Sequence, residues 1–240
     1  MQTISKIPIV LTATIMPNEV KDAVYDPEIR KAEYFRALEY YSNFTEQIYF
    51  LENSSYLLEG NALKTLPKVR LRRFAVSSNP SRGKGYQEFE MLDAWTSDAT
   101  ATPPKWLKIS GRYLVRNIGD ILDECRLETQ SSLIIDQSAR AHTARTHIFF
   151  ITSDYYRRAL VGLYMQCDDQ AGHWIERVLF RALKETAAKD FRFFRTRPDL
   201  IARSATTGEQ YPSSPVGNAV KKLLRAGNRV LDDRYLWFSR

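Results

Sequence analysis

The sequence predicts an α/β fold: a single domain with a mostly parallel central sheet flanked by helices, followed by a basic helical segment at the C-terminus. Three observations predict it. Apolar, β-rich runs alternate along the chain with segments of helical periodicity, which favours an open parallel sheet. The 240 residues are 44% hydrophobic and 26% charged, a composition that can build one large core. After residue 202, loop-forming residues and then interleaved cations replace the alternation.

The strands are expected where apolar and β-branched residues cluster between turn-forming segments. The first, IPIVLTATI, is followed by a proline and a long polar segment, as is typical of a buried parallel strand. The expected strands are residues 7–15, 48–53, 69–76, 106–115, 131–137 and 146–152.

The helices are expected between these strands. Asp26 and Pro27 supply an N-cap and a proline at the first helical position, so a helix is predicted over 27–44, and residues 7–53 form a β-α-β unit. The glycine-rich turn that opens SRGKGYQEFEMLDAW leads into a second helix. Two more helices are expected, from about Asp154 and across 173–189.

The C-terminal segment, residues 203–240, differs in character from residues 1–202. Residues 203–215 have the Gly, Pro, Ser and Thr content of a loop. Residues 217–240 combine a Val/Leu stripe with interleaved cations, namely Lys221, Lys222, Arg225 and Arg229. This pattern predicts a segment that brings the protein to an anionic membrane surface; the alternative is a helix packed on the sheet.

The net charge and the two cysteines indicate which partners and which kinds of site to expect. With 35 Lys and Arg against 28 Asp and Glu, the net charge is +7, which favours anionic partners such as nucleotides, acidic lipids or nucleic acid. No apolar run is long enough to span a bilayer, and no cleavage site follows the N-terminus, so a cytoplasmic protein is expected. This expectation includes a peripheral location at the inner face of the plasma membrane. Cys125 and Cys167 lack metal-ligand spacing and are expected to be buried thiols, and His142 and His147 are expected to be structural.

The segment SRGKGYQEF is the strongest local signal for a binding site. Its glycines, Gly83 and Gly85, flank Lys84 between a strand and a helix, where backbone N–H groups, the helix dipole and the side chains of Arg82 and Lys84 can face a phosphate. The segment matches neither the P-loop nor the dinucleotide-binding fingerprint. The alternative is a solvated basic turn.

The segment KISGRY is a second candidate. Lys108 enters a buried strand, and Ser110, Gly111 and Arg112 end it, so that a ligand can approach the backbone at the glycine and meet a guanidinium. Lys108, Ser110 and Gly111 are therefore expected to bind the substrate or nucleotide. The alternative is a strand end with a surface arginine.

Glu176 is the candidate general base. It lies near the start of an amphipathic helix, beside His173 and Trp174, where surroundings that raise its pKa would suit it to accept a proton. The alternative is a carboxylate that interacts only with the helix dipole.

In their order along the chain, IVLTATI, YFLEN, RGKGYQEFEML, WLKISGRYLVRN, THIFFIT and HWIERVLFRAL resemble bacterial glycosyltransferases of the GT-A type that build capsule or lipopolysaccharide (O-antigen) sugars. The resemblance covers roughly residues 5–190. It implies that residues 1–202 form a GT-A-like, Rossmann-like domain that binds a nucleotide-sugar and carries out catalysis. It also implies a set of nucleotide contacts: Thr12, Ala13 and Thr14 in the nucleotide pocket, Glu52 and Asn53 at the base or ribose, and Arg82 and Lys84 at the diphosphate.

The sequence departs from this family at the end of the fourth strand. Where the family has a D-x-D motif that holds a divalent metal, this chain reads Ile109-Ser110-Gly111-Arg112. A site for Mn²⁺ or Mg²⁺ is therefore not supported, and fixed cations, Arg112 with Lys84 and Arg82, are expected to neutralise the departing phosphate. Glu176 matches the late carboxylate that acts as base in inverting members, with Asp168 and Asp169 as alternatives for the base or for a late metal site.

The resemblance implies a glycosyltransferase that moves a sugar from a nucleotide-sugar donor to a saccharide or lipid-linked acceptor. The alternative is a basic nucleic-acid-binding or nucleotide-binding module, which the high aromatic content allows; yet the aromatic residues are periodic and no nucleic-acid-binding motif is found, so no nucleic-acid partner is expected. Nucleotidyltransferases and sulfotransferases are competing enzyme classes. The first normally needs acidic metal ligands, and the second needs a phosphate cradle near the N-terminus, where this chain reads TATIMPNEV.

Overall fold

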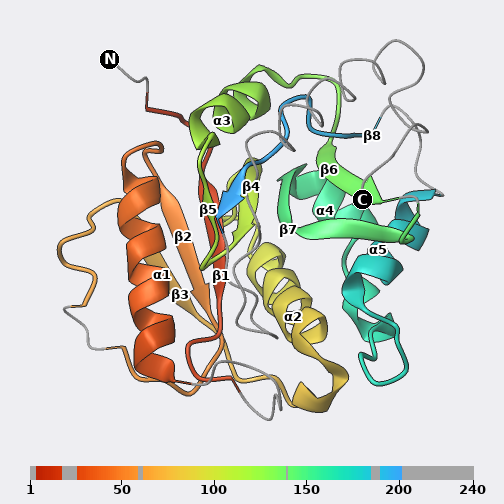
Figure 1. Cartoon of the computed structure of the whole chain (residues 1–240), viewed down its shortest axis with the longest axis horizontal. Coiled ribbons are helices and arrows are strands. Elements are labelled where there is room, and N and C mark those ends of the chain that lie inside the picture. The colour runs from red at the N-terminus through yellow and green to blue at the C-terminus, as the bar shows by residue number, and fades with distance from the viewer. Residues whose placement is uncertain (1–3, 18–25, 59–61, 139, 185–189, 202–240) are drawn as a thin grey trace.

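A computed structural model describes residues 4–17, 26–58, 62–138, 140–184 and 190–201. They form an α/β, Rossmann-like fold around a seven-stranded sheet with the order β3-β2-β1-β4-β7-β6-β8 (Figure 1). The strands are β1 (Ile9–Ala13), β2 (Ile48–Glu52), β3 (Val69–Arg73), β4 (Lys105–Ser110), β6 (Leu133–Ser138), β7 (Thr143–Thr152) and β8 (Phe191–Arg192). The predicted α/β class is confirmed.

The sheet is mostly parallel, as predicted. Strands β3, β2, β1 and β4 run parallel to one another, and β8 runs parallel to β6. Strand β7 is antiparallel to both of its neighbours, β4 and β6. The chain leaves β1 toward β2 and β3 and then returns to the other side of β1 as β4, so the strand order switches between β1 and β4.

Helices cover both faces of the sheet. They are α1 (Pro27–Ser42), α2 (Lys84–Ser97), α3 (Ile118–Leu127), α4 (Ser153–Ala159) and α5 (Ile175–Lys184), with short 3₁₀ turns η1 (Pro80–Arg82) and η2 (Leu163–Gln166). Buried residues of α1 and α3 form one core with one face of the sheet, and those of α2, α4 and α5 form a second core with the other. Figure 1 shows α1 beside β1–β3, and α4 and α5 beside β6 and β7.

Side-chain alternation along β1 and β4 places polar groups on one face. Ile9, Leu11 and Ala13 of β1 belong to the α1 core, as do Leu107 and Ile109 of β4. Because successive side chains of a strand point to opposite faces, Thr12, Lys108 and Ser110 point toward α2. At their carboxyl ends the two central strands therefore present hydroxyl and ammonium groups to this helix.

The strand predicted over 106–115 is interrupted after Ser110. The N–H group of Gly111 donates to the carbonyl of Thr12 at 3.0 Å, and a Cβ atom at this position would lie 2.6 Å from the same oxygen. The chain then turns, and β5 (Leu114–Val115) pairs with β9 (Leu200–Ile201) in a separate two-stranded sheet. The close contact between Gly111 and the carbonyl oxygen of Thr12 therefore leaves no room for a side chain at the position where β4 ends.

Other boundaries also differ from those predicted. The helix expected over 173–189 begins at Ile175 and is described as far as Lys184, and the elements α3, β8 and β9 were not anticipated. Cys125 and Cys167 are buried and free, as expected. The predicted loop and basic segment at 203–240 lie outside the described residues. Within the described ranges, none of the helices has the length and apolarity that crossing a bilayer requires.

Candidate functional site

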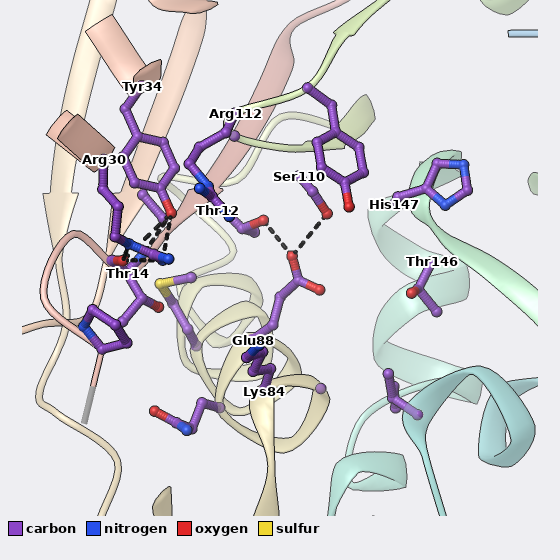
Figure 2. A pocket seen from close by; sticks show the side chains of 18 of the residues that line it. Thr12, Thr14, Arg30, Tyr34, Lys84, Glu88, Ser110, Arg112, Thr146 and His147 are labelled. Carbon is purple, nitrogen blue, oxygen red and sulfur yellow. Dashed lines mark hydrogen bonds between the residues drawn. The ribbon is translucent and has the colours of Figure 1, made fainter. Parts of the chain in front are cut away.

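A cleft with a volume of about 360 Å³ lies at the carboxyl ends of β1 and β4. This is the point where the strand order switches, and in open α/β sheets such a point is the usual place for a ligand. Figure 2 shows the cleft between Arg30, Tyr34 and Arg112 on one side and Thr146 and His147 on the other. The residues lining it are Thr12, Ala13, Thr14, Pro17, Arg30, Tyr34, Lys84, Gly85, Gln87, Glu88, Met91, Ser110, Gly111, Arg112, Tyr113, Thr146, His147, Ile175 and Glu176.

Glu88 of α2 organises the floor of the cleft. Its Oε1 accepts hydrogen bonds from the hydroxyls of Thr12 and Ser110 and lies 2.7 Å from Nζ of Lys108. Thr12 lies on β1, Ser110 ends β4 and Glu88 lies on α2, so these hydrogen bonds link the two strands to the helix. Glu88 was not among the site residues predicted from the sequence. Its position four residues after Lys84 places both on one face of the helix and was the available signal.

Lys108 is fully buried beneath the floor. Its ammonium group donates to the backbone carbonyl of Thr146 at 2.7 Å and to the hydroxyl of Ser110 at 3.1 Å, in addition to its ion pair with Glu88. Burial lowers the pKa of Lys108, and the charges of Glu88 and Glu176 oppose that shift. From the sequence, Lys108 was predicted to bind the substrate or nucleotide. In the structure its ammonium group is buried and paired with Glu88, and Lys108 does not line the cleft.

Two arginines form a cationic wall. Arg30 is buried and donates to the carbonyl oxygen of Thr14 through Nε at 3.1 Å and Nη2 at 2.6 Å. Nη1 of Arg112 lies 2.8 Å from a carboxylate oxygen of Glu33, and the side chain of Arg112 is 9% exposed. Burial lowers the pKa of Arg30, and the nearby charge of Arg112 lowers it further. Two partly desolvated guanidinium groups therefore lie close together in the cleft.

Glu176 approaches the cleft from the first turn of α5. Its Oε1 accepts a hydrogen bond of 3.1 Å from the hydroxyl of Thr146. Burial raises the pKa of Glu176, and the charges of Glu88 and Asp169 raise it further, although the hydrogen bond from Thr146 lowers it. A carboxylate in such surroundings holds a proton more strongly than an exposed one does, which suits a general base.

His147 is a neutral group in the cleft wall. Burial lowers its pKa to about 3, with further lowering by the charges of Arg145 and Lys108. Its ring centroid lies 5.9 Å from that of Tyr113, which also lines the cleft. From the sequence, His147 was predicted to be a structural residue. At neutral pH the imidazole of His147 is therefore uncharged and adds no positive charge to the cleft wall.

The glycine-rich segment 81–85 is built differently from the predicted phosphate loop. Lys84 and Gly85 line the cleft, but Arg82 donates to the carbonyls of Cys167 at 2.9 Å and Met165 at 2.7 Å, away from it. The carboxylate of Asp169 accepts a hydrogen bond from the backbone N–H of Lys84 at the start of α2. A Cβ atom on Gly83, which has a φ of +111°, would lie 2.0 Å from that carboxylate. The chain's own carboxylate therefore takes the place at the helix start that was expected for a phosphate.

Glu52 and Asn53 lie behind the cleft rather than in its lining. Glu52 is fully buried and accepts hydrogen bonds from the backbone N–H groups of Ile15 and Ser54. The amide of Asn53 accepts from the hydroxyl of Thr14 at 2.6 Å and donates to the carbonyl of Gln87 at 3.2 Å. Their hydrogen bonds hold the loop after β1. Because neither side chain lines the cleft, they are not placed to contact a base or ribose there, as was expected.

The residues of the cleft floor do not suit a divalent cation. The ammonium of Lys108 already lies among the oxygens of Glu88, Ser110 and Thr146 that an ion would need. Among the described residues, no three His, Cys, Asp or Glu side chains gather in a way that would hold a metal ion. The carboxylate of Asp168, an alternative considered from the sequence, closes a turn by accepting from the backbone of Gln170 and Ala171.

Solved structures resemble the fold at low sequence identity. The inositol-1-phosphate CTP transferase from T. maritima is 12% identical, with a TM-score of 0.46 over 81% of this chain and 86% of that one. The glycosyltransferase GlyE of Streptococcus pneumoniae TIGR4 is 11% identical, with a TM-score of 0.48; the match covers 79% of this chain but only 45% of GlyE. A CMP:2-keto-3-deoxy-manno-octonic acid synthetase complexed with CTP is 14% identical, with a TM-score of 0.42 over 94% of this chain and 99% of that one. No family model matches the chain, and no curated protein matches it in sequence.

Proposed function

We propose that this protein is a transferase that binds a nucleotide-sugar in the cleft and moves its sugar to a saccharide or lipid-linked acceptor. The observation that carries the proposal is the combination, at the switch point between β1 and β4, of a wall of two partly desolvated arginines with a half-buried carboxylate whose pKa is raised. The cleft volume of about 360 Å³ falls in the range of small-molecule sites. The sequence resemblance to GT-A glycosyltransferases of capsule or lipopolysaccharide synthesis supports the choice of donor and acceptor.

In this proposal the diphosphate of the donor binds against Arg30 and Arg112, with Lys84 on the α2 side. Guanidinium groups form charge-assisted hydrogen bonds with phosphate oxygens, and these bonds are stronger in a partly desolvated site than in water. Because Arg30 is held by the carbonyl of Thr14, its charge is fixed before the ligand arrives. Such fixed cations stabilise the charge that develops on the leaving diphosphate.

Glu176 accepts the proton of the attacking acceptor hydroxyl. The acceptor oxygen forms a bond to the anomeric carbon as the bond from that carbon to the diphosphate oxygen breaks, and the nucleoside diphosphate leaves with the bonding electron pair. Since the attack and the departure take place on opposite faces of the sugar, the configuration at the anomeric carbon is inverted. Asp169 is less suited to this role than Glu176, because its carboxylate caps α2.

Replacing Arg112 with alanine tests the site of the diphosphate. We expect the affinity for a nucleoside diphosphate to fall at least about tenfold, since hydrogen bonds to charged groups contribute about 1.5–3 kcal/mol. Transfer should slow by about 10²-fold, as on loss of one transition-state charge contact. Isothermal titration with UDP, GDP and dTDP measures the first effect, and product formation from the corresponding nucleotide-sugars measures the second.

Arg126→Ala is the matched control. Arg126 is also an arginine paired with a carboxylate, Asp123, but it lies on α3 and is 51% exposed. Unchanged affinity in the Arg112 variant would remove this residue from the site. A wild-type chain that binds none of the nucleotides at millimolar concentration would contradict the proposed function, and binding without any transfer would favour a nucleotide-binding module.

Transfer should not require a divalent metal, because the ammonium of Lys108 lies where an ion would bind. We expect the rate in excess EDTA to equal the rate in untreated buffer. Assays with EDTA alone and with EDTA followed by excess Mn²⁺ measure this. A loss of transfer in EDTA that Mn²⁺ restores would show that the catalysis depends on a metal.

A further inference from the structure

The second carboxylate oxygen of Glu88 is unused by the protein. Oε1 receives the hydroxyls of Thr12 and Ser110 and the ammonium of Lys108, whereas Oε2 makes no hydrogen bond with any residue that the structure describes. The side chain is 21% exposed and lines the cleft. In Figure 2 Oε1 points toward Thr12 and Ser110, and Oε2 is turned away from them. A carboxylate oxygen in this position can only accept a hydrogen bond from a ligand.

The buried ammonium of Lys108 holds this carboxylate in place. Lys108 is 0% exposed and is held by three oxygens, so it cannot follow a ligand into the cleft. Its Nζ lies 2.7 Å from Oε1 of Glu88 and so fixes the position of that oxygen. Lys108 is thus a positioning residue that acts through Glu88.

Charge divides the cleft into two parts. Arg30 and Arg112 lie on the α1 side, and the charge of Arg112 lowers the pKa of Arg30. Glu88 and Glu176 lie on the other side, and the charge of Glu88 raises the pKa of Glu176. Lys84 also lines the cleft, from the same face of α2 as Glu88, so a phosphate is attracted to the two arginines and to Lys84 and is repelled by the two carboxylates. A ligand that fills both parts therefore has an anionic end and an end that donates hydrogen bonds.

We propose that Oε2 of Glu88 accepts a hydrogen bond from a hydroxyl group of the donor sugar and selects neutral sugars over uronic acids. The proposal rests on the proposed function, because it assumes that a nucleotide-sugar occupies the cleft. With the diphosphate against the two arginines, the sugar lies beside Glu88. A uronic acid at this place would set a second carboxylate against Glu88, and like charges in a partly desolvated site repel each other.

The test compares three ligands that share one nucleobase: the nucleoside diphosphate, its neutral hexose derivative and its uronic-acid derivative. UDP, UDP-glucose and UDP-glucuronic acid are the set for a uridine site, and GDP or dTDP sets replace them if those bases bind more tightly. For the wild-type chain we expect the hexose derivative to bind more tightly than the diphosphate and the uronic-acid derivative to bind most weakly. Isothermal titration gives each affinity.

Glu88→Gln removes the charge but keeps the shape of the side chain. We expect the affinity for the hexose derivative, relative to that for the diphosphate, to fall at least about tenfold, as expected for loss of a charge-assisted hydrogen bond. The affinity for the diphosphate should stay equal or rise, and the discrimination against the uronic acid should shrink. Glu90→Gln, on the same helix but outside the cleft lining, should change none of these values.

A double variant keeps the test valid if the single variant unfolds. In Glu88→Gln/Lys108→Met neither charge remains, so no ammonium is left buried without a partner. This variant should show the same loss of preference for the hexose. If both variants, or the double variant alone, retain the wild-type preference, the role of Glu88 is overturned while the proposed function stands. A wild-type chain that binds no nucleotide overturns both.

Discussion

Replacing Glu176 with glutamine is expected to lower the rate of sugar transfer by about 10²- to 10⁴-fold, the range that general-base catalysis contributes. The amide keeps an oxygen that can accept the hydrogen bond from Thr146, so the position of the side chain is preserved. What is lost is the capacity to take a proton from the acceptor hydroxyl. Steady-state assays should show the loss in kcat, and isothermal titration should show nucleotide affinity close to that of the wild-type chain.

The pH dependence of transfer provides a second measurement of the same role. The pKa of Glu176 is raised above its ordinary value of 4.5, chiefly by burial. Because the base must be ionised, the wild-type rate should fall on the acid side with a midpoint above 4.5. The glutamine variant should lack this limb.

The free energy of unfolding distinguishes loss of the catalytic base from damage to the fold. The folded chain binds the proton of Glu176 more tightly than the unfolded chain does, so the ionised carboxylate destabilises the fold increasingly as pH rises from 4.5 through the raised pKa. At neutral pH the glutamine variant should therefore have an equal or higher free energy of unfolding. Glu90→Gln, a substitution of the same kind outside the cleft lining, controls for the change itself. A folded Glu176 variant that transfers at a near-normal rate would show that another group is the base.

The strands of the sheet could be predicted because each is marked by a short run of apolar residues in the sequence. Residues 7–15 and 48–53 are apolar runs with clear breaks, and they contain β1 and β2 as observed. The antiparallel direction of β7 was not predictable in this way. It depends on which strand pairs with which, and the run at 146–152 looks the same in either direction.

The cleft was only partly predictable, because its geometry depends on contacts between distant parts of the chain. The ends of β1 and β4 were found from Thr12, Ser110 and Arg112, since strand ends can be located in the sequence. Arg82 was placed at a phosphate because its neighbours suggested a loop, yet its partners are carbonyls more than 80 residues later. Glu88 was missed for the same reason: its partner Thr12 is 76 residues away.

Buried charge is the feature with the largest expected effect on stability. Glu88→Ala leaves the ammonium of Lys108 fully buried with only the hydroxyl of Ser110 and the carbonyl of Thr146 as partners. Removing one partner of a buried ion pair costs about 3–5 kcal/mol, because the remaining charge is not compensated. We expect a loss of this size in the free energy of unfolding, measured by urea denaturation at pH 7.

Lys108→Met should be much less damaging, with a loss of at most about 2 kcal/mol. The charge left behind belongs to Glu88, which is 21% exposed and keeps its hydrogen bonds from Thr12 and Ser110. The methionine side chain would lie near the ring of Phe149, whose centroid is 5.7 Å from the Lys108 ammonium. The alternation of β4 places an apolar residue, Trp106, on the same face.

Adding Lys108→Met to Glu88→Ala should restore stability, because it removes the uncompensated charge. We expect the double variant to regain at least about 2 kcal/mol relative to Glu88→Ala, a coupling between neighbouring sites that independent substitutions would not show. The pH dependence provides a further check. Burial lowers the pKa of Lys108, and loss of Glu88 removes the nearest charge opposing that shift, so the unfolded chain binds this proton more tightly than the folded variant does. The stability of Glu88→Ala should therefore recover as pH rises toward about 10, the ordinary lysine pKa. Additive losses in the double variant, with no recovery at high pH, would show that the ammonium of Lys108 finds another way to be solvated when Glu88 is absent.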